Sequence, residues 1–149
     1  MANDKHVAML KKGVATWNNW RRENSDLNPD LSYADLTNAD LSGLNLTRAQ
    51  LWGANLTHAN LANANLGFAR LNKVDLTRAH LVNAKLNGVD LLGADLSGAD
   101  PTGANLTGAD VTGANLSGAD LTGANLTGAD VTGVGALTQA GRSLSGADR

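Results

Sequence analysis

Few residues of this chain are of types that could do chemistry, so we first ask whether any of them form a site. His80 and Asp100 are the pair that could share a proton or supply half of a metal site. The chain has no cysteine, no serine is placed as a nucleophile, and no third ligand accompanies the pair. We therefore expect His80 and Asp100 to form an ordinary surface pair. We expect no catalytic residue, metal or cofactor.

The recurring glycines do not predict a phosphate-binding loop. From Gly88 onward a glycine recurs every five residues, without a G-x-x-x-x-G-K-[ST] motif among them. The G-A-[DN]-L-[ST] runs superficially resemble calcium-binding β-roll repeats. Those repeats are nine residues long and cluster their aspartates in turns. We therefore expect the glycines to have a structural role.

The element that must position these residues is a five-residue repeat between positions 31 and 133. Every fifth residue from Leu31 is leucine except Pro101, Val111 and Val131, and a small apolar residue, nearly always alanine, lies two positions before each centre. An α-helix would spread these leucines around its circumference, and a flat strand would alternate them between its faces. The chain must therefore coil with leucine and alanine inside, and glycine suits the corners. The predicted core ladder is Leu31, Leu36, Leu41, Leu46, Leu51, Leu56, Leu61, Leu66, Leu71, Leu76, Leu81, Leu86, Leu91, Leu96, Leu106, Leu116, Leu121 and Leu126.

This A-[DN]-L-x-x pattern resembles the pentapeptide-repeat family over 21 consecutive units, about 70% of the chain. The leader at residues 17–21 also resembles leaders of bacterial family members. The resemblance implies an all-β solenoid, namely a right-handed quadrilateral β-helix with four pentapeptides per coil. Residues 31–133 would then form about five coils, with a height of roughly 25 Å.

Residues 1–30 predict an α-helical cap on the open end of this solenoid. Segment 4–22 has no proline and helical spacing, Asn3 or Asp4 can act as the N-cap, and Pro29 follows the helix. A basic amphipathic helix on a membrane is the alternative, but the charge of the segment is mixed. The expected capping residues are Val7, Leu10, Val14, Trp17 and Trp20.

Outward residues twenty positions apart should stack in columns along such a solenoid, and these columns predict contacts. Arg70 and Asp90 can then pair, and Arg48 should lie under Phe68 at a distance suited to a cation–π contact. Pro101 lacks a backbone donor, so we expect a local lapse in pairing there. An amide ladder interrupted by Lys85 should form from Asn45, Asn65, Asn105 and Asn125.

Large apolar side chains at outward positions predict a patch for a protein partner. Tryptophan, tyrosine and arginine are typical of binding hot spots. Scattered apolar side chains are also normal on protein surfaces, which is the alternative interpretation. The candidate partner patch consists of Tyr33, Trp52, Phe68, Lys73 and Leu92.

Charge is segregated along the repeats, with a net +4 over residues 45–85 and a net −6 over residues 86–141. The family resemblance implies a further hypothesis, because some members resemble duplex DNA and thereby occupy DNA gyrase or topoisomerase IV. Six aspartates within about 10 Å approach the charge density of B-DNA, roughly one charge per 1.7 Å, although the basic belt opposes this role. The candidate DNA-mimic acids are Asp90, Asp95, Asp100, Asp110, Asp120 and Asp130.

Our first functional hypothesis is therefore a non-catalytic protein-binding or scaffold module, with DNA mimicry as the alternative. We favour direct nucleic-acid binding through the basic belt less than either. Residues 134–149 fall out of register, which would leave a poor lid and predicts a homodimer through the C-terminal coils. There is no apolar signal region in residues 1–13 and no window of roughly 18 apolar residues, so we expect a cytoplasmic protein without membrane contact.

Overall fold

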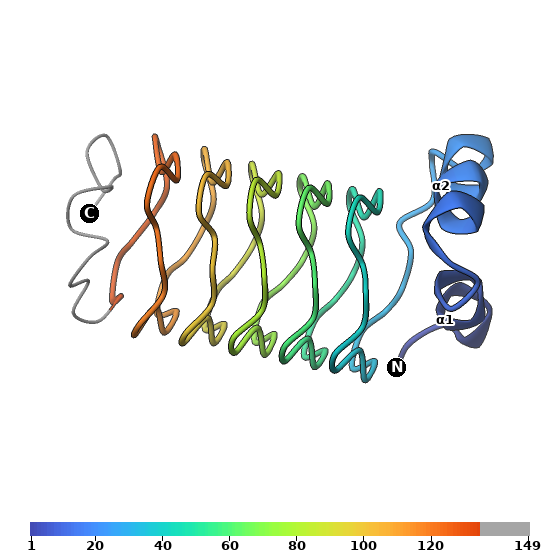
Figure 1. Ribbon diagram of the computed structural model, residues 1–149, viewed down its shortest axis with the longest axis horizontal. Coiled ribbons are helices and arrows are strands. Elements are labelled where there is room, and N and C mark those ends of the chain that lie inside the picture. Colours follow the sequence, from blue (N-terminus) through green and yellow to red (C-terminus); the bar gives the residue numbers. More distant parts are fainter. Residues whose placement is uncertain (135–149) are drawn as a thin grey trace.

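A computed structural model describes residues 1–134, which form two short helices followed by a solenoid of turns (Figure 1). Helix α1 spans Asp4–Leu10 and helix α2 spans Val14–Glu23. The coils lie side by side along one axis, and both helices lie against the N-terminal end of the stack (Figure 1). The out-of-register segment and the dimer contacts predicted beyond residue 134 lie outside the described residues. Within residues 1–134, neither α1 nor α2 has the length and apolar character that a membrane span requires.

Parallel bridges between residues twenty positions apart hold the coils together. Within residues 1–134 these are isolated single-residue bridges separated by turns, so the β-solenoid is present without continuous strands. Consecutive coils are also joined by short backbone hydrogen bonds from the repeat centres to the carbonyl nineteen residues later. The Leu31 N–H, for example, donates to the Gln50 carbonyl at 2.7 Å. Four ladders of bridges run along the stack, and they begin at Asp30, Asp35, Asp40 and Asn45.

Each corner is a four-residue turn whose third residue has a left-handed backbone. In the first corner the Ala34 N–H donates to the Leu31 carbonyl at 3.1 Å, and Tyr33 has a φ of 59°. A positive φ at this position is typical of a type II turn, where glycine is preferred. From Gly88 to Gly133 the position is always glycine, which explains the glycine period, but nine earlier corners place a larger residue there.

Leucine and alanine fill the interior of the solenoid. All eighteen ladder leucines are buried, and so are Pro101, Val111 and Val131. The preceding small residues are buried as well, apart from Ala34 and Ala39, which are partly buried. Burying one leucine contributes about 1.5–3 kcal/mol, so this ladder explains why the chain folds as it does.

The single N-terminal helix predicted over residues 4–22 is wrong, because the chain breaks between α1 and α2. Gly13 adopts a φ of 101°, which no α-helix accommodates, and glycine in mid-helix is unfavourable in any case. Asn3 caps α1, and its side chain accepts from the N–H groups of Lys5 and His6. The break gives two helices that can each turn an apolar side onto the first coil.

Side chains of α2 satisfy the open edge of the first coils. The Trp17 indole, fully buried, donates to the Asn45 carbonyl at 2.7 Å, and the Asn18 side chain accepts from the Asn45 N–H at 2.8 Å. Arg21 is also buried and donates to the Thr47 carbonyl at 3.1 Å. These bonds replace those that a preceding coil would make. Of the expected capping residues, Leu10 and Trp17 are buried, and Val7, Val14 and Trp20 are partly buried against the core.

The local break in backbone pairing predicted at Pro101 is confirmed. Within residues 1–134 the bridges of this ladder stop at Asp100, and no bridge joins Asp100 to Asp120. The lapse is small, because the neighbouring Gly103 N–H still donates to the Thr122 carbonyl at 2.9 Å. Proline therefore removes one donor without opening the coil.

Candidate functional site

Every large apolar side chain that the described solenoid exposes lies on one face. Tyr33 is 55% exposed, Trp52 36%, Phe68 61% and Leu92 44%. Trp52 and Leu92 belong to one column, and Tyr33 lies in the same stack of corners. Phe68 lies in the preceding corner, on the other side of the ladder that contains Gln50 and Arg70. We call this surface the aromatic face and define it by Tyr33, Arg48, Gln50, Trp52, Phe68, Arg70, Asn72, Lys73 and Leu92.

Two of the exposed rings rest on glycines of the next coil. A Cβ at Gly53 would lie 2.6 Å from the Tyr33 ring, and a Cβ at Gly88 would lie 2.6 Å from the Phe68 ring. Tyr33 also packs edge-on against Trp52, with ring centroids 4.8 Å apart and planes at 87°. Packing therefore holds these aromatic side chains in place before any partner binds, which lowers the entropy lost on binding.

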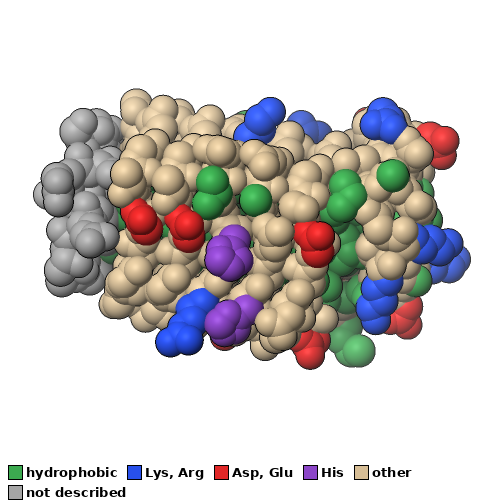
Figure 2. All heavy atoms as spheres, viewed as in Figure 1, with side chains coloured by type: hydrophobic (Ala, Val, Ile, Leu, Met, Phe, Trp, Pro, Cys, Tyr) green, Lys and Arg blue, Asp and Glu red, His purple; other side chains and the backbone are tan. Residues whose placement is uncertain are grey.

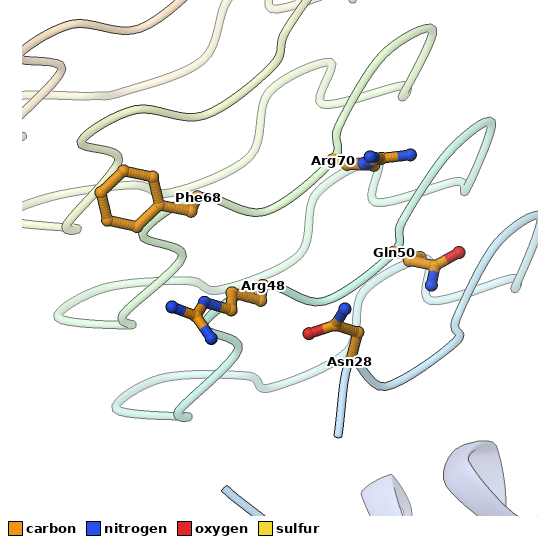
Figure 3. A pocket seen from close by; sticks show the side chains of 5 residues that line it. All are labelled: Asn28, Arg48, Gln50, Phe68 and Arg70. Carbon is orange, nitrogen blue, oxygen red and sulfur yellow. The ribbon is translucent and has the colours of Figure 1, made fainter. Parts of the chain in front are cut away.

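The aromatic face contains two hollows of about 410 Å³ each, with a shared wall. Gln50 and Arg70 form that wall, and Figure 3 shows Arg48 and Phe68 on the opposite side of the first hollow. The first hollow is lined by Asn28, Arg48, Gln50, Phe68 and Arg70. The second is lined by Ser32, Gln50, Trp52, Arg70, Asn72 and Asp90.

The cations of the aromatic face have no acidic partner in the described chain. No ion pair within 4.0 Å joins Arg70 to Asp90, so that predicted pair is wrong. The Asp90 carboxylate instead accepts from the Leu92 N–H at 3.1 Å. The predicted cation–π contact between Arg48 and Phe68 is absent from residues 1–134 as well, where the recorded ring contacts involve other residues.

The outward aspartates and asparagines of the bridge ladders close the turns that follow them. The Asp95 carboxylate accepts from the Ser97 N–H at 2.9 Å, and the Asn105 carboxamide accepts from the Thr107 N–H at 3.0 Å. This arrangement is an Asx turn. The asparagine column is joined through backbone bridges, but no bond between side-chain amides is found in the described part of the chain. The predicted amide ladder is therefore wrong, because each amide oxygen is used in its own turn.

Four bridge positions carry neither aspartate nor asparagine, and the turns after them stay open. The backbone N–H groups two residues later have no acceptor within the described chain. Two of these open N–H groups belong to Trp52 and Asn72, which lie one coil apart and both line the second hollow. We did not predict them, although the departures from the Asp/Asn pattern are visible in the sequence. The four departures are Gln50, Arg70, His80 and Lys85, and the open N–H groups belong to Trp52, Asn72, Val82 and Asn87.

The six candidate DNA-mimic acids are spread over three faces. One ladder carries Asp90, Asp110 and Asp130. Asp95 lies on a second ladder and Asp100 on a third, and Asp120 follows Asp100 in the twenty-residue register. Hydrogen bonds from Thr132, of its side chain first and then its backbone, lower the pKa of Asp130, and Thr122 does the same for Asp120. Acidic side chains form no continuous stripe on the face shown in Figure 2.

His80 and Asp100 lie next to each other, joined by a backbone bridge. No ion pair between them is recorded within 4.0 Å in residues 1–134. The same residues contain no group of three or more His, Cys, Asp or Glu side chains that could hold a metal ion.

Comparison with known proteins identifies the family. The family model for pentapeptide repeats matches residues 30–63, 39–78, 64–100 and 102–134, which is more than half of the chain. No curated protein sequence matches the chain.

Three solved structures illustrate the likeness. HetL, a pentapeptide-repeat protein involved in heterocyst differentiation regulation in the cyanobacterium Nostoc sp. strain PCC 7120, is 29% identical, with 70% of this chain and 71% of HetL covered and a TM-score of 0.47. A pentapeptide-repeat protein of the Arabidopsis thaliana thylakoid lumen is 33% identical, and the match covers 77% of this chain and 73% of that protein with a TM-score of 0.44. QnrB1, a plasmid-mediated fluoroquinolone resistance protein, is 21% identical, and the match covers 70% of this chain and 65% of QnrB1 with a TM-score of 0.51. At this identity the likeness shows a shared fold and no more. The chain belongs to the pentapeptide-repeat family.

Proposed function

We propose that this chain is a non-catalytic protein-binding module and that the aromatic face is its binding surface. The observation that carries the proposal is the gathering of all large exposed apolar side chains of the described solenoid on this face. Arg48, Arg70 and Lys73 lie among them without an ion pair in the described chain. A few residues contribute most of the binding free energy of a protein interface, and they are most often tryptophan, tyrosine and arginine.

Four corner residues of the aromatic face have a strained backbone. Tyr33, Arg48, Phe68 and Lys73 have φ values of 57–59°, at the position that later coils fill with glycine. A non-glycine residue in this left-handed conformation costs about 1–2 kcal/mol. Five of the nine strained corners in the described chain lie elsewhere, so this strain is compatible with a functional role of the aromatic face but does not single it out.

The architecture suits the display of a fixed surface. We propose a right-handed quadrilateral β-helix of about five coils over residues 31–133, capped by α1 and α2 within residues 1–30. Side chains on such a rigid element keep their mutual geometry, which favours binding. The cytoplasmic location and the homodimer through the C-terminal coils stay predictions.

Site-specific photo-cross-linking tests the binding surface. A benzophenone amino acid at Leu92, which is 44% exposed, would report contacts of the aromatic face, and the same group at Thr122 would report another face. We expect a defined protein adduct from position 92 alone, lost when Trp52→Glu is added. Equal adducts from both positions, or none from position 92, would overturn the proposal. Circular dichroism checks that each variant is folded.

The DNA-mimic alternative has weaker support. Its best observation is the row of Asp90, Asp110 and Asp130, which repeats every coil, about 4.8 Å, whereas duplex DNA carries a charge every ~1.7 Å. Arg70 precedes this row on the same ladder and opposes an anionic mimic. A supercoiling assay with purified gyrase, with and without fluoroquinolone, decides the matter. Protection that Asp110→Asn abolishes would favour mimicry over our proposal.

A further inference from the structure

We propose that the aromatic face recognises an acidic segment of its partner through a carboxylate site. The site consists of the open N–H groups of Trp52 and Asn72 together with the Arg70 guanidinium. This inference rests on the protein-binding function proposed above and adds the chemistry of the partner. The carboxylate is that of an aspartate or glutamate of the partner, next to an apolar residue in an extended segment.

The first argument is that the protein itself shows what these N–H groups bind. In every described turn that follows an aspartate or asparagine of the ladders, the same N–H donates to the side-chain oxygen, at 2.9 Å in the Asp110 turn and 3.1 Å in the Asp100 turn. The aspartate turns use a carboxylate oxygen in this place. Gln50 and Arg70 do not supply that oxygen to Trp52 and Asn72. A carboxylate from a partner therefore has a position prepared for it.

The second argument is the pairing of the open turns. Trp52 and Asn72 lie one coil apart, about 4.8 Å, and both line the second hollow. The other two open N–H groups, of Val82 and Asn87, follow His80 and Lys85 on two different ladders and lie singly. Among the described turns that follow the ladder positions, two open N–H groups one coil apart therefore occur only on the aromatic face.

The third argument is charge. Arg70 lines both hollows, Arg48 lines the first, and neither has an ion pair in the described chain. A carboxylate in the second hollow can therefore accept charge-assisted hydrogen bonds from Arg70 in addition to the backbone donors. Trp52 lines the same hollow and provides the apolar contact next to the carboxylate.

The hollow favours a peptide over a nucleic acid. Asp90 lines the second hollow one coil beyond Arg70, so the sign of charge changes along the site within about 4.8 Å. A continuous polyanion would meet Asp90, whereas a peptide can place a neutral or basic residue there. The Trp52 ring also packs against the Tyr33 ring, with ring planes at 87°.

Restoring the repeat consensus closes the site without disturbing the fold. Gln50→Asn and Arg70→Asn each supply the missing turn acceptor for Trp52 and Asn72, as asparagine does in the neighbouring turns. Arg70→Lys keeps the charge and leaves the turn open. His80→Asn and Lys85→Asn make the same kind of change on other faces and serve as matched controls.

Fluorescence anisotropy with a panel of labelled twelve-residue peptides tests the site. Each peptide carries a Leu-Phe core flanked by glutamate, lysine or serine blocks, and a labelled twelve-residue thymidine oligonucleotide stands for nucleic acid. We expect the glutamate peptides to bind best, with affinity that falls at high salt. Gln50→Asn and Arg70→Asn should each weaken that binding about tenfold, a loss of about 1.4 kcal/mol. Arg70→Lys should weaken it less, and the two controls should leave it unchanged.

Nitrogen-15 spectra of the full chain provide a second readout. The Trp52 and Asn72 amide signals should shift with the glutamate peptides, and the Val82 and Asn87 signals should not. The carboxylate site is overturned if glutamate peptides bind no better than serine peptides, or if Gln50→Asn leaves binding intact. Preferential binding of the oligonucleotide would assign the face to nucleic acid instead. If position 92 still cross-links a protein while Gln50→Asn has no effect, the binding face stands and the carboxylate site falls.

Discussion

Replacing Lys85 with asparagine should stabilise the solenoid by closing an open turn. Lys85 interrupts a column in which Asn65 and Asn105 each accept from their own turn at 3.0 Å. The Asn87 N–H, two residues after Lys85, has no acceptor in the described chain. An asparagine at position 85 would supply that acceptor with the backbone geometry that the column already has.

The size of the effect follows from one added hydrogen bond. Such a bond contributes about 0.5–1.5 kcal/mol to the free energy of unfolding. Removing the lysine should cost little, because Lys85 makes no ion pair in residues 1–134. For a chain of 149 residues, 1 kcal/mol corresponds to about 2–4 °C, so we expect the Tm to rise by about 1–6 °C.

Thermal and urea unfolding, followed by circular dichroism at low and high salt, measure this change. Lys85→Gln is the matched control, since it removes the same charge but carries the longer amide that leaves the turn open at Gln50. Lys85→Asn should be the more stable variant at both salt concentrations. An equal gain in both variants would show that relief of charge repulsion, and not the turn, is responsible.

Two further predictions concern a corner and the N-terminal helices. Gly88→Ala should lower the free energy of unfolding by about 1–3 kcal/mol more than Gly108→Ala. Both glycines have a φ near +65°, but only a Cβ at Gly88 would clash with the Phe68 ring. Equal losses in urea unfolding would contradict this reasoning. Burial lowers the pKa of His6 from 6.5, with a smaller opposing effect of Asp30. The unfolded chain therefore binds more protons, and stability should fall as the pH drops below about 6.5. His6→Gln should flatten this dependence between pH 5 and 7, and an unchanged profile would refute the assignment.

The fold was predictable because a five-residue period is compatible with neither a helix nor a flat strand. The break at Gly13 was not predicted, since the apolar stripe from Val7 to Trp17 continues through it at helical spacing. The stripe records which residues pack on the first coil, and two helices joined at a glycine satisfy it as well as one.

For the candidate site, the columns were predictable and the contacts were not. The period places Arg70 and Asp90 on one ladder, but the nearby Leu92 N–H takes the Asp90 carboxylate at 3.1 Å. Each carboxylate on the ladders has a backbone N–H donor two residues away. The carboxylate therefore accepts this local hydrogen bond in place of an ion pair with a cation one coil away. The open N–H groups of Trp52 and Asn72 follow from the same rule, applied where the turn acceptor is missing.

The turn hydrogen bond also helps to distinguish residues that serve folding from residues that serve binding in the irregular repeats. Gln50 and Arg70 each forgo a turn hydrogen bond that asparagine would provide, so both positions are less stable than the repeat allows. Stabilising substitutions at functional positions commonly reduce activity. If Gln50→Asn and Arg70→Asn raise the Tm and weaken peptide binding about tenfold, the two departures serve the binding of a partner. If they raise the Tm and leave binding unchanged, the departures are incidental and the aromatic side chains alone must explain the binding.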